Sequence, residues 1–553
     1  MALFAELRRR NVLKVALLYA VACWLVVWFV AVVQAEVSVP AWTGAFTYFV
    51  LAVGYPVALW FAWTYEFTPG GLKKAADVDQ TQSIVYKTGQ KLNSAVAVLL
   101  VLGVLAVFGQ RLLPTFEFLV PGIPEGDAPA SADVPADIRS LTLNNGLKII
   151  VWPDHDIPNV VMYNFVRAGS RNEYPGITGL SHFFEHMMFL GTSNLEPGEF
   201  DRTMEAAGGA NNAYTSSDLT VYMDWFPVSA LETIFEIEAD RFQNLETYAD
   251  AVQSEREVVS SERRSRVDND NFSMLAEQMQ AATFVAHPYQ FPIIGWPSDI
   301  VSWTEDDLRS HYETYYAPNN RTIVIAGDVT PKQIFGLAEK YFAPIPAQEP
   351  PPSVDTVEPP QKGERRIVVE ASAQTPLLHI AFHAGRASDP QSLPLSLLLS
   401  ILADGDSSRL HRLLVEDARS ALSVGAWLDE GFDPGLAYFY LTLPPGGDPD
   451  LVERQLLDVL AAVVAEGVSE AELEKARNIV LADFWRALST ISGKARTVGD
   501  FEVFHGNYES LFGLPSRLEA VTVGDLQAAA AAIFDNDNMT VGVLRSPDED
   551  GAL

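Results

Sequence analysis

Cysteine is nearly absent from this sequence of 553 residues, because Cys23 is the only one. A single thiol cannot form a disulfide within the chain, so internal disulfides do not stabilise the fold. Zinc sites built from several cysteines are excluded for the same reason. Any metal site must therefore be built from histidine and carboxylate ligands.

Basic residues are also scarce, with 38 Lys and Arg against 71 Asp and Glu and a formal net charge of -33. Residues 1–115 hold nine of the basic and five of the acidic residues, so the rest of the chain is strongly acidic. A nucleic-acid partner is not expected, since binding to phosphates requires a basic surface. The acidic surface is accounted for by solubility, and attraction of basic peptides is the sharper alternative.

Long uncharged runs occur only before residue 115 and predict a membrane module over residues 1–114. Three apolar stretches, about 11–33, 42–63 and 92–113, are each long enough to cross ~30 Å of hydrocarbon as a helix. Lys and Arg lie at the start of the first stretch and in the loop between the second and third, whereas the loop between the first and second has none. The positive-inside rule therefore places the N-terminus in the cytoplasm and everything after the third helix outside.

The opening sequence FAELRRRNVLKVALLYAVACW loosely resembles a membrane module found at the start of varied bacterial proteins. That resemblance implies a multi-pass protein of the bacterial inner membrane whose main part is periplasmic. An alternative stays open, because the Arg-rich start and Val33-Gln34-Ala35 also fit a signal peptide. In that case residues 1–35 would be cleaved, and the later helices would still leave the remainder outside.

Two linkers divide the rest of the chain. Residues 115–138 are rich in Pro, Ala and Asp, and residues 344–363 contain two proline clusters. The predicted domains are 139–343 and 364–553. The first opens with the strand-like LTLNNGLKIIVWP, in which Asn-Asn-Gly is a turn signal.

The two domains look like a diverged repeat. The segment around Ala168-Gly169 aligns without a gap with the segment around Ala384-Gly385. Three polar residues of the first copy then face apolar residues of the second: His182, Glu185 and His186 correspond to Leu398, Ile401 and Leu402. The second domain is therefore predicted to keep the fold and lack the metal, and chance similarity of two amphipathic segments is the alternative.

The segment GLSHFFEHMMFLGT, residues 179–192, carries the strongest chemical signal. On a helix, His182 and His186 lie one turn apart on the same face, where two neutral imidazoles can hold zinc. Glu185 lies beside them and can take a proton from a metal-activated water. A buried helix with two structural histidines is the plainer interpretation of the same pattern.

A third ligand is expected on the helical segment 250–270. Glu255 and Glu262 are seven residues apart and share one helix face. Glu262 is the candidate ligand, and Glu255 is a candidate partner that fixes the orientation of a ligating histidine. Alone, a Glu-rich helix is usually a solvated face.

The motif HFFEH followed by GT resembles the inverted zinc motif of the pitrilysin-like (M16-type) peptidases, the inverzincins. The 75 residues between His186 and Glu262 are similar to the interval in that family, as are three further segments: GGANNAYTSSDLTVYMD, HPYQFPIIG and YYAPNNRTIVIAGDV. The resemblance covers the chain from about residue 140 to the end.

The resemblance implies an α+β fold with two homologous sheet-and-helix domains following the three-helix transmembrane segment. It also implies one Zn²⁺ per chain, held by His182, His186 and Glu262, with Glu185 as the general base. Asn212 and Ala213 would bind the backbone of an extended peptide by strand addition.

The chain has one such lobe, whereas a complete family chamber uses two. In the family, the lobe opposite the zinc supplies an Arg and a Tyr, and here their positions correspond to Val415 and Leu422. Neither side chain can donate a hydrogen bond to an oxyanion. A heterodimer with a partner lobe that supplies the Arg/Tyr pair is therefore expected, with a homodimer as the alternative.

The predicted activity is zinc-dependent endoproteolysis of peptides or unfolded segments. A non-catalytic structural or assembly subunit of a membrane complex is the competing hypothesis. The presence of His182, Glu185, His186 and Glu262 together favours the enzyme, since a scaffold has no need of all four.

Overall fold

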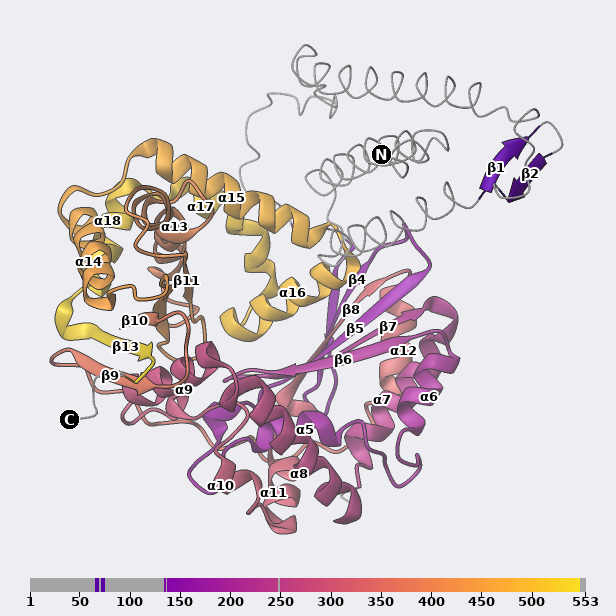
Figure 1. Ribbon diagram of the computed structural model, residues 1–553. Helices are drawn as coiled ribbons and strands as arrows, with labels where there is room; N and C mark the ends of the chain where they lie inside the picture. Colours follow the sequence, from indigo (N-terminus) through magenta and orange to yellow (C-terminus); the bar gives the residue numbers. More distant parts are fainter. Residues whose placement is uncertain (1–64, 69–70, 75–133, 136, 247–248, 548–553) are drawn as a thin grey trace. The chain divides into compact units, whose positions relative to one another are not determined.

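The computed structural model describes residues 65–68, 71–74, 134–135, 137–246 and 249–547 (Figure 1). The chain forms two compact units, Met1–Ala128 and Pro129–Leu553. In the first unit, β1 (Tyr65–Thr68) and β2 (Gly71–Lys74) pair as an antiparallel hairpin. The membrane helices predicted at about 11–33, 42–63 and 92–113 and the possible cleavage near residue 35 lie outside the described residues. Within the described ranges, no helix has the length and apolarity needed to cross a membrane.

The second unit begins with a six-stranded mixed sheet in the order β3-β4-β8-β5-β7-β6. The first two strands form the hairpin indicated by LTLNNGLKIIVWP, with Gly146 in its turn at a φ of 87°. The strands are β3 (Arg139–Thr142), β4 (Lys148–Pro153), β5 (Asn159–Val166), β6 (Ala210–Thr215), β7 (Thr220–Pro227) and β8 (Arg321–Gly327).

A second sheet of five strands has the order β11-β12-β10-β13-β9. Its strands are β9 (Arg365–Glu370), β10 (Leu377–His383), β11 (Ser423–Leu428), β12 (Leu436–Thr442) and β13 (Met539–Arg545). Reading both sheets from β6 and from β11 gives the same strand order, with β3 as the only addition. The predicted repeat of β5 in β10 agrees with this topology.

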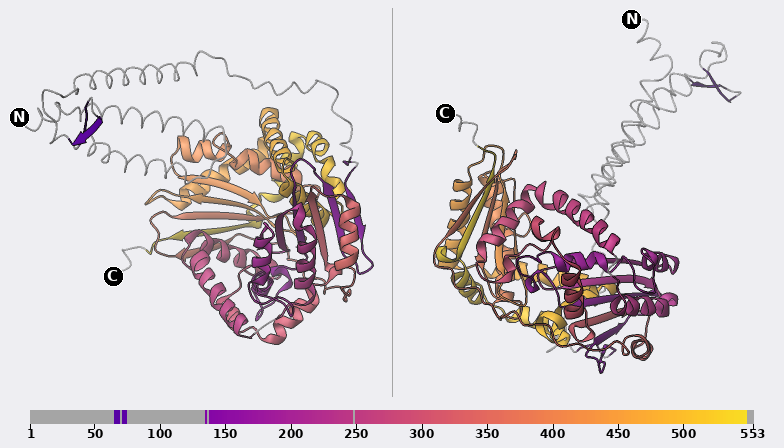
Figure 2. Two further views of the ribbon diagram at one scale, coloured as in Figure 1. Left: turned by 90° about the vertical axis from the view of Figure 1, so that its right-hand side faces the viewer. Right: turned by 90° about the horizontal axis from the view of Figure 1, so that it is seen from below.

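Helices cover the outer face of each sheet (Figure 2). On the first sheet, alternate strand residues such as Ile149, Val151 and Met162 pack into one core with the outer helices. These are α6 (Glu199–Ala206), α7 (Leu231–Gln243) and α12 (Pro331–Tyr341). Near the end of the sheet lie α5 (Leu180–Met187), α8 (Ala249–Arg263), α10 (Pro297–Ile300) and α11 (Glu305–Tyr315).

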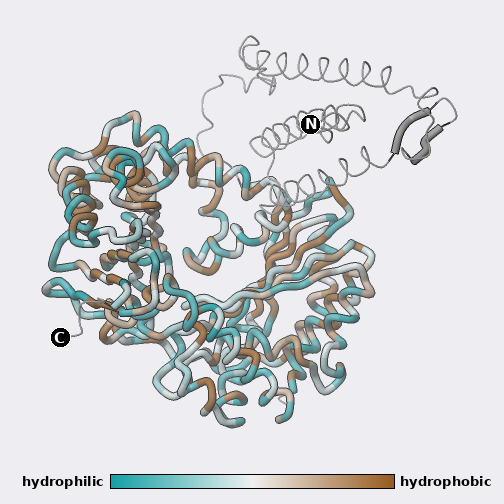
Figure 3. Tube along the Cα trace, in the orientation of Figure 1, coloured by the Kyte–Doolittle hydropathy of each residue, from teal (hydrophilic) through white to brown (hydrophobic). Residues whose placement is uncertain are grey.

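The second sheet has a matching outer layer. Strand residues such as Leu378, Ile380 and Phe439 pack against these helices in a single apolar core. The helices are α13 (Ser392–Ala403), α14 (Pro449–Glu466), α15 (Glu470–Leu488), α17 (Leu514–Ala520) and α18 (Val523–Ile533). Several strands are largely hydrophobic in Figure 3, whereas the surrounding helices alternate in polarity.

Each inner face is covered by a helix that comes from the other half of the chain. The helix α16 (Ile491–His505) packs on β5 and β8 of the first sheet, and α9 (Asn271–Thr283) packs on β9, β10 and β13 of the second. Figure 1 shows α16 between the two sheets. In chain order, the pairs α7 and α14, α8 and α15, and α9 and α16 are equivalent, so the exchange is reciprocal. The linker boundaries predicted from the sequence did not indicate this exchange.

Two glycines allow these crossing helices to lie close to the sheets. A Cβ on Gly499 of α16 would lie 2.1 Å from the ring of Phe165 on β5. A Cβ on Gly542 of β13 would lie 2.5 Å from the sulfur of Met279 on α9. Both distances are far below van der Waals contact. Each helix can therefore pack this closely on its sheet only because the residue at the contact is glycine.

Candidate metal centre

The helix α5 is held in place at its N-terminus by a buried carboxylate. Gly179 precedes the helix at a φ of 85°, and a Cβ there would meet the carbonyl oxygen of Ile294 at 2.5 Å. Glu173 accepts hydrogen bonds from the backbone N–H groups of Gly179 and Ser181, each at 2.7 Å. Burial raises the pKa of Glu173 to about 8. These bonds satisfy helix donors that would otherwise have no partner.

One face of α5 is apolar and the other carries the histidines. Phe183, Phe184 and Met187 are fully buried in the core beneath the helix. His182 and His186 project from the same side with ring centroids 4.8 Å apart, as their spacing predicts. The apolar residues therefore fix the helix, and the histidines face α8.

The structure brings together His182, His186 and Glu262, whose candidate ligand atoms all lie within 4.8 Å of one another. The Oε2 atom of Glu262 is 3.6 Å from Nε2 of His182 and 3.4 Å from Nε2 of His186. Tetrahedral zinc with bonds of about 2.0–2.1 Å places its ligand atoms about 3.4 Å apart. The observed separations are long for hydrogen bonds and suit a shared cation.

A second observation tests the fit of a metal. Oε2 of Glu262 is buried without a hydrogen-bond partner among the described residues. The other oxygen, Oε1, is 3.1 Å from Nε of Arg266 one helical turn later. Buried carboxylate oxygens are rarely left without a partner, so the free atom fits a cation ligand. The donor set of two imidazoles and one carboxylate is one that catalytic zinc uses.

Glu255 has the position predicted for it, seven residues or about two helical turns before the candidate ligand Glu262. Its Oε1 atom lies 2.7 Å from Nδ1 of His186. A carboxylate at this nitrogen fixes the ring orientation and leaves Nε2 as the ligand atom.

The charges of the centre are coupled. Burial and the neighbouring His186 lower the pKa of His182 to about 4. Burial alone would lower the pKa of His186, but the hydrogen bond with Glu255 and the nearby negative charge of Glu262 outweigh it and raise that pKa to about 9. Two adjacent imidazoles therefore do not both carry protons, and one cation between them satisfies both rings.

Glu185 lies on α5 between the two histidines in sequence. Its Oε2 atom accepts a hydrogen bond of 2.6 Å from the hydroxyl of Thr215 at the end of β6. Burial raises the pKa of Glu185, which is the direction expected of a carboxylate that acts as a base near neutral pH.

Sequence reasoning missed three supporting residues. Thr215 had no signal, because its contact depends on the fold of β6 against α5. Glu173 likewise contacts the helix only through tertiary structure. Arg266 stands four residues after Glu262, and that helical spacing was the one available hint.

Asn212 and Ala213 lie on β6, the edge strand of the first sheet. The backbone N–H of Ala213 donates to Oδ1 of the neighbouring Asn212 side chain at 2.9 Å, in place of a strand partner. This edge therefore has backbone groups available to an added strand.

The second domain has no equivalent polar cluster at the aligned positions. Leu398, Ile401 and Leu402 are residues of α13, and their side chains are buried in the apolar core of the second domain. Val415 lies in a π-helical turn, His411–Asp417, and packs against that core, while the Leu422 side chain is exposed.

Comparison with known proteins agrees with the fold. Residues 154–295 match the family model "Insulinase (Peptidase family M16)", and residues 302–480 match "Peptidase M16 inactive domain". The chain is similar to zinc protease PqqE of Helicobacter pylori, with 28% identity over 411 residues, 74% of this chain and 92% of the relative.

Solved structures have the same architecture. A protease from Helicobacter pylori superposes with a TM-score of 0.71 and 28% identity, over 74% of this chain and 99% of the other. The periplasmic protease PqqL of Escherichia coli gives a TM-score of 0.64 at 20% identity, over 75% of this chain and 48% of the other. At that identity the second likeness concerns the fold alone. Together with the two family models, these matches show that the chain belongs to the M16 peptidase family.

Proposed function

We propose that the chain is a zinc-dependent endopeptidase that hydrolyses peptides or unfolded protein segments. The observation that carries this proposal is the close grouping of His182, His186 and Glu262. Within this group, the buried Oε2 atom of Glu262 has no hydrogen-bond partner among the described residues. The relatives named zinc proteases support the same chemistry. One Zn²⁺ per chain is expected, because the described residues contain one such cluster.

In this proposal His182, His186 and Glu262 hold the metal, and Glu255 keeps His186 in its ligating orientation. When bound, zinc polarises the scissile carbonyl and lowers the pKa of its water toward about 7. Glu185 takes the proton from the attacking water and passes it to the leaving amine. Thr215 holds one oxygen of Glu185 and so directs the carboxylate at the site of attack.

Substrate is positioned by β6. A peptide that adds as a strand beside Asn212 and Ala213 exchanges backbone hydrogen bonds with this edge, and such bonds require little sequence specificity. Since Thr215 ends the same strand, the scissile bond would be held next to Glu185.

Hydrolysis of a mixed set of unstructured fluorogenic peptides by the purified, zinc-loaded full-length chain tests the proposal. Glu185→Gln should lower kcat by about 10²–10⁴ while zinc content and fold are kept, because only the proton acceptor is lost. Unchanged hydrolysis in this variant would remove Glu185 from its assigned role. A chain that binds no zinc would favour the structural-subunit alternative.

Glu262→Ala tests the metal ligand, with Glu257→Ala on the exposed face of the same helix as its matched control. Zinc content should fall in the first variant and stay near one per chain in the second, because a two-histidine site is under-coordinated. Full zinc occupancy in Glu262→Ala would show that another residue is the third ligand.

We further propose that a second lobe completes the chamber. Val415 and Leu422 offer no hydrogen-bond donor where an Arg/Tyr pair is expected, and the chain matches only about half of PqqL. A heterodimer is the expected assembly. Sedimentation and activity of the purified chain test this, since a homodimer with full peptidase activity would overturn it.

The proposed location is the bacterial inner membrane with the peptidase part in the periplasm, on the basis of the apolar runs and the Lys and Arg distribution before residue 115. Protease added to intact spheroplasts should then digest the part after residue 138. Protection of that part until the membrane is lysed would contradict this topology.

A further inference from the structure

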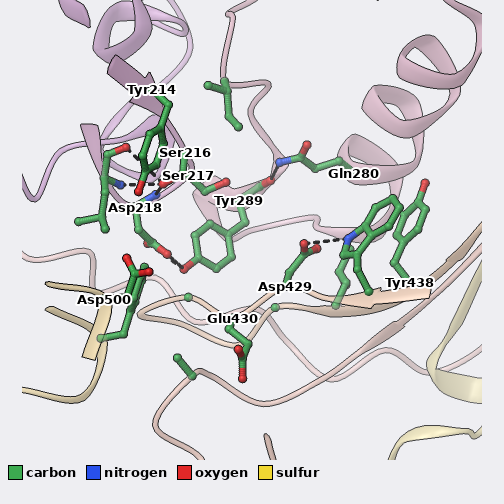
Figure 4. A pocket seen from close by; sticks show the side chains of 18 of the residues that line it. Tyr214, Ser216, Ser217, Asp218, Gln280, Tyr289, Asp429, Glu430, Tyr438 and Asp500 are labelled. Atoms are coloured by element: carbon green, nitrogen blue, oxygen red, sulfur yellow. Dashed lines mark hydrogen bonds between the residues drawn. The ribbon is translucent and has the colours of Figure 1, made fainter. Parts of the chain in front are cut away.

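A cavity of about 610 Å³ lies between the two domains, on the other side of β6 from the metal centre. Its walls come from the turn between β6 and β7, the crossing helices α9 and α16, and the strands β11 and β12 (Figure 4). Part of the lining, including Tyr214, Asp218 and Tyr289, comes from segments that resemble the family, but the proposed chemistry does not use the cavity.

The lining combines aromatic rings with carboxylates. Trp427 and Tyr438 stack on one wall with centroids 4.4 Å apart and planes inclined by 11°. The other aromatic residues of the lining are Tyr214, Phe284, Tyr289, Phe501 and Phe504. Four acidic side chains share this space: Asp218, Asp429, Glu430 and Asp500. Arginine and lysine side chains bind well to such combinations of aromatic faces and carboxylates.

Three of the four carboxylates already have partners. Asp218 lies 3.3 Å from Nε of Arg171 and accepts a hydrogen bond of 2.8 Å from Tyr289. Asp500 is 3.7 Å from Nε of Arg496. Glu430 accepts a hydrogen bond from the hydroxyl of Ser392.

Asp429 differs from the other three. It accepts a hydrogen bond of 3.0 Å from the indole N–H of Trp427, and within the described ranges no lysine or arginine pairs with it. The Asp429 side chain is accessible from the cavity, and partial desolvation by the surrounding protein raises its pKa to about 6. A cationic group that entered the cavity would supply the missing partner.

The strand β6 connects this cavity with the metal centre. Side chains alternate across a strand, and on β6 Thr215 contacts Glu185 on one face while Tyr214 packs with the inner-face core on the other. The guanidinium of Arg496 lies over the ring of Tyr214 at 5.8 Å. Residues directly opposite in an antiparallel pair share a face, so a peptide residue opposite Tyr214 would point toward the cavity.

We propose that this cavity is a subsite for a basic side chain, arginine above all, of a peptide paired with β6, and that Asp429 binds its guanidinium. The inference rests on the proposed peptidase function and adds a substrate class to it. Arginine is favoured over lysine because its planar guanidinium can stack on an outer face of the Trp427–Tyr438 pair while it bonds a carboxylate.

Binding is measured first, so that the test does not depend on turnover. The zinc-loaded full-length chain carrying Glu185→Gln is titrated against labelled unstructured peptides that differ only in arginine or its neutral isostere citrulline. Fluorescence anisotropy should show that the arginine peptide binds about tenfold tighter or more. Only arginine can form a charge-assisted hydrogen bond with Asp429, whereas citrulline is neutral. Equal affinities for the two peptides would overturn the proposal.

Variants assign the effect to one residue. Adding Asp429→Asn should reduce the arginine preference to about twofold, while Asp429→Glu, which keeps the charge, should recover part of it. Asp458→Asn on the exposed face of α14 is the charge-matched control and should leave the preference unchanged. A preference that survives Asp429→Asn would also overturn the assignment.

Hydrolysis by the wild-type chain then tests the subsite separately from the proposed peptidase activity. Arginine placed successively at each position of a cleavable peptide should raise kcat/KM at one position. Cleavage without preference at any position would remove the subsite and leave the peptidase. Arginine-selective binding with no cleavage of any peptide would keep the subsite and remove the peptidase.

Discussion

The helices α5 and α13 hold equivalent places in two copies of one fold, yet of these two helices only α5 carries candidate metal ligands. Each follows the central strand of its sheet and packs against an equivalent helix, α8 in the first domain and α15 in the second. On α8 the facing residues are Glu255 and Glu262, whereas α15 buries Leu473 and Ala476. The contrast shows that the fold supplies the positions and that the chemistry requires polar residues on both helices of the pair.

The largest effect is expected when the first domain receives the residue of the second. His186→Leu, which copies Leu402, should remove bound zinc and lower hydrolysis by at least about a hundredfold. The fold should persist, because α13 shows that leucine suits this position of the architecture. Zinc content by mass spectrometry and peptide turnover measure the effect, and the exposed His155→Leu is the control. Full zinc content in His186→Leu would show that His186 is not needed to bind the metal and that the two domains do not differ in the way proposed.

The reverse change, Leu402→His, should not create a second metal site. Leu402 is fully buried, so an imidazole there loses apolar contacts and lacks hydrogen-bond partners. We expect a loss of about 3 kcal/mol or more in the free energy of unfolding, with zinc content unchanged. Denaturant titration measures this, and Leu451→His, at an exposed position on α14, should change stability by less than about 0.5 kcal/mol.

Smaller losses of folding stability, of two different sizes, are expected when the glycines at the crossing helices are replaced. Gly499→Ala forces a methyl group against the ring of Phe165 and should cost about 1–3 kcal/mol of folding stability. Gly542→Ala should cost less, because the Met279 side chain that it meets is flexible. Thermal unfolding of the two variants side by side gives the ranking, and equal losses would show that the two exchanges are packed alike.

The smallest expected effect concerns the residue that orients the base. Thr215→Val keeps the shape and removes the hydroxyl, so kcat should fall by about three- to tenfold with zinc content unchanged. Thr215→Ser retains the donor and should keep most of the activity. The strand β11 of the second domain ends instead with Leu428, in keeping with the loss of the base there. A loss of zinc in Thr215→Val would point to a role in the metal site itself.

Part of this organisation was predictable from local spacing. His182 and His186 share a helix face because they are four residues apart, and Glu255 and Glu262 do so because they are seven apart. The turn at Gly146 and the repeat of β5 in β10 also follow from short patterns. In each case a local period carries the information.

Other features depend on contacts that no local period encodes. The amphipathic pattern of α16 predicts a buried face, but it does not reveal that this face lies on the sheet of the other domain. The contact of Thr215 with Glu185 likewise depends on how β6 pairs with β7 and lies beside α5. The isolation of Asp429 becomes apparent only when the cavity and its neighbours are placed together.

The exchange of α9 and α16 has a consequence for synthesis on the ribosome. The strands of the first sheet are all made once Gly327 has been added, but the helix that covers their inner face ends at His505. Until that helix emerges, Tyr163, Phe165 and Val324 lie on an apolar surface that water would otherwise contact. During synthesis, the inner face of the first sheet therefore stays exposed for about 180 residues after its last strand is complete.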